Sequence, residues 1–440
     1  MKNNNIVRLQ KGCNQFRFLI WVIVFVLLGL TSSNLDAQNR KIALFGSSVA
    51  NASGDTTGAG GYAGSLTRLL SIRGWEVVNI SRGGDNTTKI LQRFETQLLP
   101  AKPKYVIIGL SLGNEGIMVA TELARNRAFE KYRSGLFNLI QLCRLNELYP
   151  IVAGCYARND FQPQQYEATR RMNLIINTWD VPSINMLGPI DNGKGNWLEG
   201  YYHDKSHPDF KGHREMYFAI VPSLFEAIEA GKPVPSKIRS TGYVSIKKSD
   251  NSGSLSFIPD DTIHSWSISF LVRTIGQGTV AAINPGKHAS AIEITGGKIK
   301  YQSVTESVLE NDTTSENKAW QYIVVTHQYA SGTTTFYSNG KEAGTLSESI
   351  DFKEFVLGGY GNAKSTSAPD EAGFKDLFIY RSVLNYDEVK ALYYDQLIQS
   401  SLEVYAPLND DIFKPGEPVK NLAQSMSKLI CRGANLVPVK

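Results

Sequence analysis

In the first half of the chain, short apolar runs alternate with stretches in which apolar residues recur at helical spacing. Apolar runs bounded by turn residues predict strands, whereas apolar residues three or four positions apart predict amphipathic helices. Strands are expected at 41–46, 76–80, 105–111, 151–155 and 182–186, and helices at 62–73, 87–99, 125–148, 163–179 and 209–230. Because strands that alternate with helices pair in parallel, the pattern predicts a doubly wound α/β sheet with helices on both faces.

The pattern changes after a stretch punctuated by Gly and Pro at 231–236. Beyond it, short β-rich runs are separated by turns, and one helix is expected at 385–394. The dipeptide Asn339-Gly340 is a signal for a two-residue hairpin. Strands are expected at 243–246, 265–272, 278–283, 291–294, 320–327, 333–338, 355–358, 374–380 and 402–407. Strands at this spacing predict an all-β sandwich of the jelly-roll kind.

These changes divide the chain into a leader at 1–37, an α/β domain at 38–235 and a β-sandwich domain at 241–438. The leader has an apolar run at 18–30 that follows four basic residues, Lys2, Arg8, Lys11 and Arg17. This arrangement is typical of a secretory signal peptide, here cleaved after Ala37. Phe16 and Thr31 could extend the apolar run, so an uncleaved membrane anchor is the alternative. The sequence predicts a secreted protein, located in the periplasm, at the cell surface or outside the cell.

Charge and cysteine content exclude some classes of partner. The leader accounts for +3 of the net charge of +5, which leaves +2 on the rest of the chain and no basic block suited to nucleic acid. Three cysteines follow the leader, which itself holds Cys13. Cys143 lies on the apolar stripe of a predicted helix, which favours a buried thiol, although a disulfide to Cys155 stays open. No cysteine spacing resembles a zinc site, and Cys431 has no evident partner.

Polar clusters follow the predicted strands of the α/β domain. Ser48 follows the first strand, Gly83-Gly84 the second, and Asn114 the third, while Asp204 and His207 precede the last helix. Because ligands bind at the carboxyl ends of the strands in open parallel sheets, we expect these residues to meet at one rim. Each cluster taken alone could be a turn or a helix cap. Their joint placement favours an active site.

A serine hydroxyl needs an imidazole to accept its proton and a carboxylate to hold that imidazole in the right tautomer. Asp204 and His207 are three residues apart, so one tight turn can present both side chains to the same side. Of the six histidines, only His203, His207 and His213 precede residue 240, so the base must come from this region. A zinc site built from these histidines and Asp204 is a weaker alternative, because their spacing fits no helical pair.

Taken together, these residues resemble the SGNH (GDSL-type) hydrolase family over about 190 residues. The resemblance implies a flavodoxin-like sheet and a serine esterase without a cofactor. It assigns Ser48 as the nucleophile, His207 as the base and Asp204 as the acid, with an oxyanion hole made by Ser48, Gly84 and Asn114. Two departures stand out: Ser47 replaces the usual Asp, and the third block reads Leu-Gly-Asn-Glu at 112–115 instead of Gly-x-Asn-Asp.

The second domain resembles the laminin-G-like/concanavalin-type sandwich, on the stretches 266–272, 320–326, 336–340 and 375–394. Some relatives of that kind bind calcium, so calcium in this domain is possible. In the first domain, Trp197, Tyr201 and His203 precede the base and are candidates to contact substrate, with aromatic packing in the loop and a solvated His203 as the alternatives. The resemblance says nothing about oligomeric state.

The pairing of the two domains suggests a carbohydrate O-acetylesterase that acts on an acetylated glycan. A lipid or aryl-ester acylhydrolase and a non-catalytic glycan-binding protein are the alternatives. Since the candidate triad lies wholly before residue 240, deletion of 237–440 is expected to leave the turnover of small aryl acetates almost unchanged.

Overall fold

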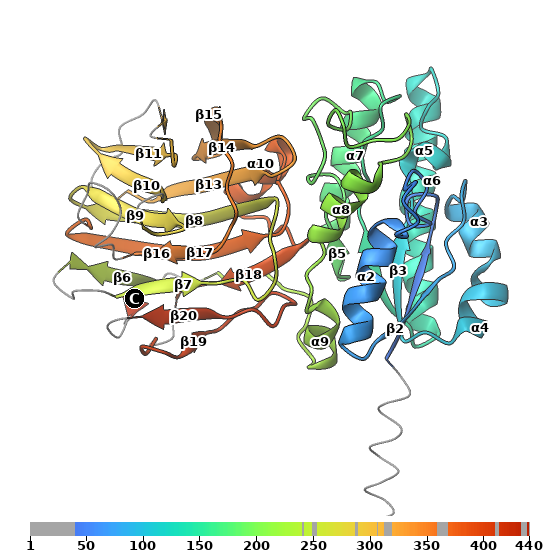
Figure 1. Cartoon of the computed structure of the whole chain (residues 1–440), viewed down its shortest axis with the longest axis horizontal. Coiled ribbons are helices and arrows are strands. Elements are labelled where there is room, and N and C mark those ends of the chain that lie inside the picture. The colour runs from blue at the N-terminus through green and yellow to red at the C-terminus, as the bar shows by residue number, and fades with distance from the viewer. Residues whose placement is uncertain are drawn as a thin grey trace, which may run out of the picture.

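The computed structural model describes residues 40–239, 242–248, 253–286, 289–305, 307–311, 319–358, 368–409, 413–432 and 438–439. The expected signal peptide, Cys13 and His288 lie outside the described residues. Two differently built parts lie side by side, an α/β part and a part made almost entirely of strands (Figure 1). In the described part of the chain, no helix is both long enough and apolar enough to cross a membrane.

The α/β part contains a parallel sheet of five strands in the order β2-β1-β3-β4-β5. Its strands are β1 (Lys41–Gly46), β2 (Glu76–Asn79), β3 (Tyr105–Gly109), β4 (Tyr149–Ala153) and β5 (Ser183–Ile184). The chain order reverses between β1 and β3, which pair so that Gly46 lies opposite Gly109. Loops leave the sheet in opposite directions at such a switch point, which opens a crevice at the carboxyl ends of the strands.

Helices cover both faces of this sheet, as expected for a doubly wound fold (Figure 1). One face packs on α2 (Gly61–Ile72), α8 (Phe210–Phe218) and α9 (Leu224–Glu229) through a core that includes Leu66, Met216 and Phe225. The other face packs mainly on α3 (Thr87–Gln92), α6 (Glu122–Leu145) and α7 (Pro163–Ile176). The remaining short helices are a π-helical turn (Phe94–Leu98), α4 (Leu99–Ala101) and α5 (Leu112–Glu115).

Two of the predicted helices are wrong in extent. The closing helix expected at 209–230 is interrupted between α8 and α9, where Pro222 has no N–H to donate and its ring obstructs a continuous helix. The helix expected at 87–99 divides after α3, where the buried Arg93 donates to Ile80 O and forms an ion pair with Asp85. In both stretches the apolar residues keep helical spacing across the break, so the pattern predicted one long helix.

The second part is an antiparallel sandwich, which confirms the predicted fold class. One sheet has the order β12-β11-β10-β9-β16-β7-β20-β19, and the other has β15-β14-β13-β8-β17-β6-β21 with β18 paired to β17. The strands are β6 (Tyr243–Lys247), β7 (Ser254–Phe257), β8 (Trp266–Ile275), β9 (Gly278–Ile283), β10 (Ser290–Thr295), β11 (Lys298–Gln302), β12 (Val308–Glu310), β13 (Gln321–Gln328), β14 (Thr333–Ser338), β15 (Lys341–Ser347), β16 (Phe355–Leu357), β17 (Glu371–Tyr380), β18 (Leu402–Ala406), β19 (Pro418–Val419), β20 (Leu429–Arg432) and β21 (Pro438–Val439).

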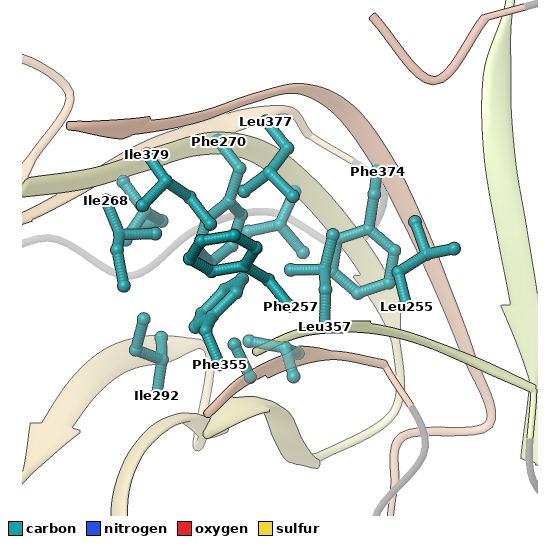
Figure 2. Close-up of a cluster of buried hydrophobic side chains, with 14 of the residues drawn as sticks. Leu255, Phe257, Ile268, Phe270, Ile292, Phe355, Leu357, Phe374, Leu377 and Ile379 are labelled. Carbon is teal, nitrogen blue, oxygen red and sulfur yellow. The ribbon is translucent and has the colours of Figure 1, made fainter. Parts of the chain in front are cut away.

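Side chains from both sheets fill the core of the sandwich. Figure 2 shows Phe257, Phe355 and Ile292 from one sheet packed against Phe270 and Ile379 from the other. The expected helix is α10 (Tyr386–Tyr393). The expected hairpin joins β14 to β15: its two turn residues, 339 and 340, have φ of 51° and 73°, and left-handed backbone of this kind matches the twist of the flanking strands.

Buried hydrogen bonds join the two parts. Asn177 Oδ1, at the end of α7, accepts the backbone N–H groups of Gln399 and Ser400 at 2.8 and 2.9 Å. Gln328, from β13, donates to the carbonyl oxygens of Gly188 and Asp191 at 3.0 and 2.8 Å. The segment that holds these last two carbonyls leads along the chain to the loop with Asp204 and His207. Buried polar groups are costly to leave unpaired, and the groups named here find their hydrogen-bond partners in the other part.

A second contact fixes α8 against the sandwich. His264 Nδ1 lies 2.9 Å from Glu215 Oε2, and both side chains are almost fully buried. The imidazole ring lies 3.7 Å from the Phe218 ring and 3.9 Å from the Tyr329 ring, measured between centroids. Since α8 begins directly after the loop with His207, the sandwich holds the helix that supports this loop.

The stability of the α/β part depends on pH through a buried carboxyl group beside the interface. Burial raises the pKa of Asp191 to about 6, although Tyr166 donates a hydrogen bond of 2.5 Å to its carboxylate. A carboxyl group with a raised pKa stabilises the fold below its unfolded pKa near 4, and this contribution is lost as the pH rises toward 6. Because the pKa rises from near 4 to about 6 on folding, the free energy of unfolding falls over this pH range by an amount on the order of 3 kcal/mol.

We therefore expect Asp191→Asn to raise the free energy of unfolding at pH 8 and to change it little at pH 4. The amide can accept from Gly193 N–H, as the carboxylate does, and can donate to the Tyr166 hydroxyl. Urea unfolding at both pH values measures the difference, with the exposed Asp180→Asn as the matched control. An equal effect of Asp191→Asn at pH 4 and pH 8 would contradict this account.

The three described cysteines, Cys143, Cys155 and Cys431, are free and buried. Burial raises the pKa of both Cys143 and Cys155 to about 12. Cys143 and Cys155 therefore form no disulfide, which was one of the two possibilities that the sequence allowed.

Candidate active site

Ser48 begins a tight turn at the carboxyl end of β1. The turn is tied to β3 by Ser47 N–H, which donates to Gly109 O at 2.8 Å, and it is closed by Ser53 N–H, which donates to Ser48 O at 2.9 Å. A side chain at Gly46 would collide with Gly109 O, so glycine is needed where β1 meets β3. Ser48 is half-buried, and its Oγ forms no hydrogen bond with any described residue.

Asp204 and His207 form a pair within one loop. His207 Nδ1 lies 3.0 and 2.9 Å from the two carboxylate oxygens of Asp204, and Ser206 N–H donates to the same carboxylate at 2.7 Å. Partial burial acts to raise the pKa of Asp204, but the hydrogen bonds from His207 and Ser206 outweigh it and lower the pKa. With its proton on Nδ1, the imidazole leaves Nε2 free to accept a proton.

The loop that holds this pair lies against the Ser48 turn. A Cβ at Gly54 would lie 2.9 Å from His207 Cβ and would collide with Pro208 O, and Gly54 has a φ of +94°. His213, in α8, accepts Tyr62 N–H at 3.4 Å and donates from Nε2 to Ser53 O at 3.0 Å. The structure therefore places the His207 loop against the turn that contains Ser48, but no hydrogen bond joins the two side chains. Such bonds are often long before substrate binds.

The other two predicted rim residues lie beside this turn. Gly84 has a φ of +74° in an open turn, and a Cβ on its neighbour Gly83 would lie 4.0 Å from Ser48 Cβ. Asn114 Nδ2 donates to Asp85 O at 3.0 Å, which ties the loop after β3 to the loop after β2. Neither Ser48 N–H nor Gly84 N–H has an acceptor among the described residues. Unpaired donors at one rim are what an oxyanion hole requires.

The two sequence departures from the family pattern differ in their surroundings. Ser47 is fully buried, and its hydroxyl makes no hydrogen bond of standard geometry with the described residues, although Tyr156 lies nearby. Glu115 accepts both the N–H and the hydroxyl of Thr87 at 2.9 Å, and it pairs with Lys131 at 3.1 Å. The glutamate therefore connects α5 with the first turn of α3 and with α6.

Arg158 is a rim residue that the sequence analysis missed. Its guanidinium pairs with both oxygens of Asp160 at 2.9 and 2.8 Å and donates to Ser206 Oγ at 2.7 Å. It also lies over Gly113, where a Cβ would collide with Nη1. The displaced glycine of the third block thus makes room for an arginine. An arginine in a loop gives no periodic signal, so only the unusual position of Gly113 could have indicated it.

The residues expected to contact substrate differ in placement. Trp197 is 3% exposed and packs in the core near Tyr156, with ring centroids 6.2 Å apart, so it is a packing residue. Tyr201 is half-buried against the same core, and burial raises its pKa. His203 is exposed on the loop beside His207. Only His203 offers an open side chain at the rim.

The weaker alternative of a zinc site finds no support in the described residues. Both ring nitrogens of His213 are engaged, with Tyr62 N–H and Ser53 O. No group of three His, Cys, Asp or Glu side chains is arranged to hold a metal ion within the described ranges.

Comparison with known proteins agrees with this geometry. Residues 44–215 match the model of the GDSL-like lipase/acylhydrolase family. No curated protein matches the chain. A Bacteroides fragilis protein classed as an acylhydrolase is 16% identical over 44% of this chain and 88% of its own, with a TM-score of 0.34. A Desulfitobacterium hafniense protein classed in the G-D-S-L lipolytic family is 18% identical over 41% of this chain and 96% of its own, with a TM-score of 0.34.

A Bacteroides ovatus protein classed as carbohydrate-binding is 13% identical over 47% of this chain and 61% of its own, with a TM-score of 0.37. At these identities and TM-scores, the solved structures do not indicate what this chain binds or hydrolyses. The family match, in contrast, covers the turn with Ser48, the Gly84 turn, Asn114 and the Asp204–His207 loop. Residues 44–215 of the α/β domain therefore match the GDSL-like lipase/acylhydrolase family model.

Proposed function

We propose that this protein is a secreted serine esterase that removes O-acetyl groups from polysaccharide through an acyl-enzyme intermediate. The observation that carries the proposal is the Asp204–His207 pair, which lies against the turn of a half-buried Ser48 whose hydroxyl has no hydrogen-bond partner among the described residues. The predicted leader supports secretion.

In the proposed reaction, Ser48 Oγ attacks the ester carbonyl while His207 Nε2 takes the hydroxyl proton. Asp204 accepts a hydrogen bond from Nδ1 and stabilises the imidazolium that forms. Negative charge on the carbonyl oxygen is stabilised by Ser48 N–H, Gly84 N–H and the Asn114 side-chain amide. One such donor can contribute about 3 kcal/mol to transition-state stabilisation.

The tetrahedral intermediate then collapses, and His207 gives its proton to the departing alcohol oxygen. Acetylated Ser48 remains. A water molecule attacks this ester with His207 again as the base, which releases acetate and restores the serine hydroxyl. The protein groups named here are sufficient for each proton transfer, and we propose no cofactor for the reaction.

A polar rim favours a short acyl group on a polar alcohol. The loops beside Ser48 expose charged or polar side chains, namely Arg82, Lys89, His203 and Lys205. A long acyl chain gains binding energy only where apolar surface covers it, at about 25 cal/mol per Å². A sugar ring with hydroxyl groups suits the polar side chains named here.

We expect acetate esters to be cleaved at least about 100-fold better than octanoate esters, because several extra methylenes exceed a small acyl pocket. Measuring kcat/KM for aryl acetate, butyrate and octanoate tests the acyl preference, and acetylated xylan and pectin test the glycan. A preference for octanoate would instead indicate a lipid acylhydrolase.

A further inference from the structure

Two cationic side chains flank Asn114 at the rim of the α/β domain. On one side, Lys89 Nζ donates to Gly84 O at 3.0 Å. On the other side, the guanidinium of Arg158 lies over Gly113, the residue before Asn114. Asn114 is tied to the Gly84 side by its hydrogen bond to Asp85 O. One cation therefore contacts the loop that accepts from the candidate oxyanion amide, and the other lies against the residue before it.

Arg158 keeps donors available for a ligand. Its Nε and Nη2 are used by Asp160 and Ser206, which hold the guanidinium in a fixed orientation. No acceptor among the described residues takes the hydrogens of Nη1, the nitrogen that lies against Gly113. The side chain is 14% exposed, so its charge is partly shielded from water and acts more strongly on a neighbouring ligand than a fully solvated charge.

Three cationic side chains on the rim loops form no ion pair with any described residue. Arg82 and Lys205 are exposed on the same loops, and neither they nor Lys89 form an ion pair within the described ranges. Two acidic residues of these loops pair with a cation, Asp160 with Arg158 and Asp85 with Arg93. Asp204 binds the neutral imidazole of His207, and Asp55 accepts backbone N–H groups. The chain after the leader is close to neutral.

We propose that the active site takes esters that carry a carboxylate, such as an acetylated polymer of uronic-acid sugars, and that Lys89 Nζ and Arg158 Nη1 bind this carboxylate. Charge-assisted hydrogen bonds to a carboxylate are stronger than bonds between neutral groups, and cations that form no ion pair raise the local concentration of an oppositely charged substrate. This proposal rests on the proposed esterase function and narrows its substrate class.

A matched pair of small esters isolates the charge. 4-Acetoxybenzoate and 4-acetoxybenzamide differ in the carboxylate and share the acetyl ester. At low ionic strength, the ratio of kcat/KM for the anionic ester over the neutral ester should exceed about 10. It should fall toward one in about 0.5 M NaCl, where charges are screened within a few ångströms. Acetylated polygalacturonate should likewise be preferred to acetylated xylan.

Charge-removing variants locate the effect. Lys89→Gln and Arg158→Gln should each lower the anionic-to-neutral ratio several-fold. Lys102→Gln is the matched control, because Lys102 is exposed just before β3, at the opposite end of the sheet, and its replacement should leave the ratio unchanged. If Arg158→Gln disturbs the loop through Ser206, as a lower melting temperature would reveal, Lys89→Gln decides the result.

The outcomes separate the two proposals. A ratio near one that does not respond to salt or to Lys89→Gln overturns the carboxylate site while leaving the esterase intact. Failure to hydrolyse either ester overturns the esterase. In that case calorimetry with 4-hydroxybenzoate and 4-hydroxybenzamide still tests the site: tighter binding of the anion, weakened by Lys89→Gln, supports it, and equal binding contradicts it.

Discussion

Replacing Ser48 with alanine is expected to lower kcat for acetate esters by a factor on the order of 10⁴ or more, with little change in the melting temperature. Loss of a nucleophile removes the acyl-enzyme route altogether, and only binding and the oxyanion donors still act on the substrate. The hydroxyl has no hydrogen-bond partner among the described residues, so its removal leaves no buried group unpaired.

Ser65→Ala is the matched control for this variant. Ser65 lies on α2, and its hydroxyl accepts only an exposed hydrogen bond from Arg68. Its replacement should leave kcat within a factor of about two, because surface changes of this kind cost little. Near wild-type turnover in Ser48→Ala would contradict the assigned nucleophile, and Ser47 would be the next residue to replace.

Deletion of residues 237–440 is expected to abolish aryl acetate turnover and to lower the melting temperature sharply. The sequence alone predicts the opposite, because all candidate catalytic residues precede residue 240. The contacts between the two parts argue for a loss instead, because the deletion removes both donors of Asn177 Oδ1 and the His264 partner of Glu215. The deletion would also expose to water the Phe218 ring, which packs on the His264 ring.

Circular dichroism melts and aryl acetate kinetics on the isolated 38–236 fragment measure both effects. A milder variant, Gln328→Leu, keeps the sandwich but removes the two hydrogen bonds to Gly188 O and Asp191 O. It should lower the melting temperature in the same direction by less. A fragment that melts and turns over like the full chain would show that the interface contributes nothing to the active site.

Buried strands and helices were predictable because burial imposes a hydrophobic pattern. β1, β9 and β14 lie within the predicted ranges, since each is bounded by turn residues. The strands β7, β11, β12, β15, β19, β20 and β21 were missed. Lys298–Gln302 alternates polar with apolar residues over a short length, and Lys341–Ser347 lies at a sheet edge with mostly polar residues. Edge strands bury too little surface to impose a strong pattern.

The candidate site was predictable only in part. Ser48, Gly84, Asn114, Asp204 and His207 follow or precede regular elements, so the rule for parallel sheets placed them at one rim. The roles of Arg158, Gln328 and His264 depend on contacts between residues far apart in the chain. No local spacing encodes such contacts. Trp197 shows the converse: an aromatic residue near the base suggested a substrate contact, but its ring is buried in the core.

The most direct test of the central claim is covalent labelling with a fluorophosphonate, followed by mass spectrometry of the labelled peptides. This account predicts one modified residue, Ser48, with labelling abolished in Ser48→Ala and strongly slowed in His207→Ala, because the imidazole activates the hydroxyl. Labelling of any other residue, or equal labelling of wild type and Ser48→Ala, would contradict the account.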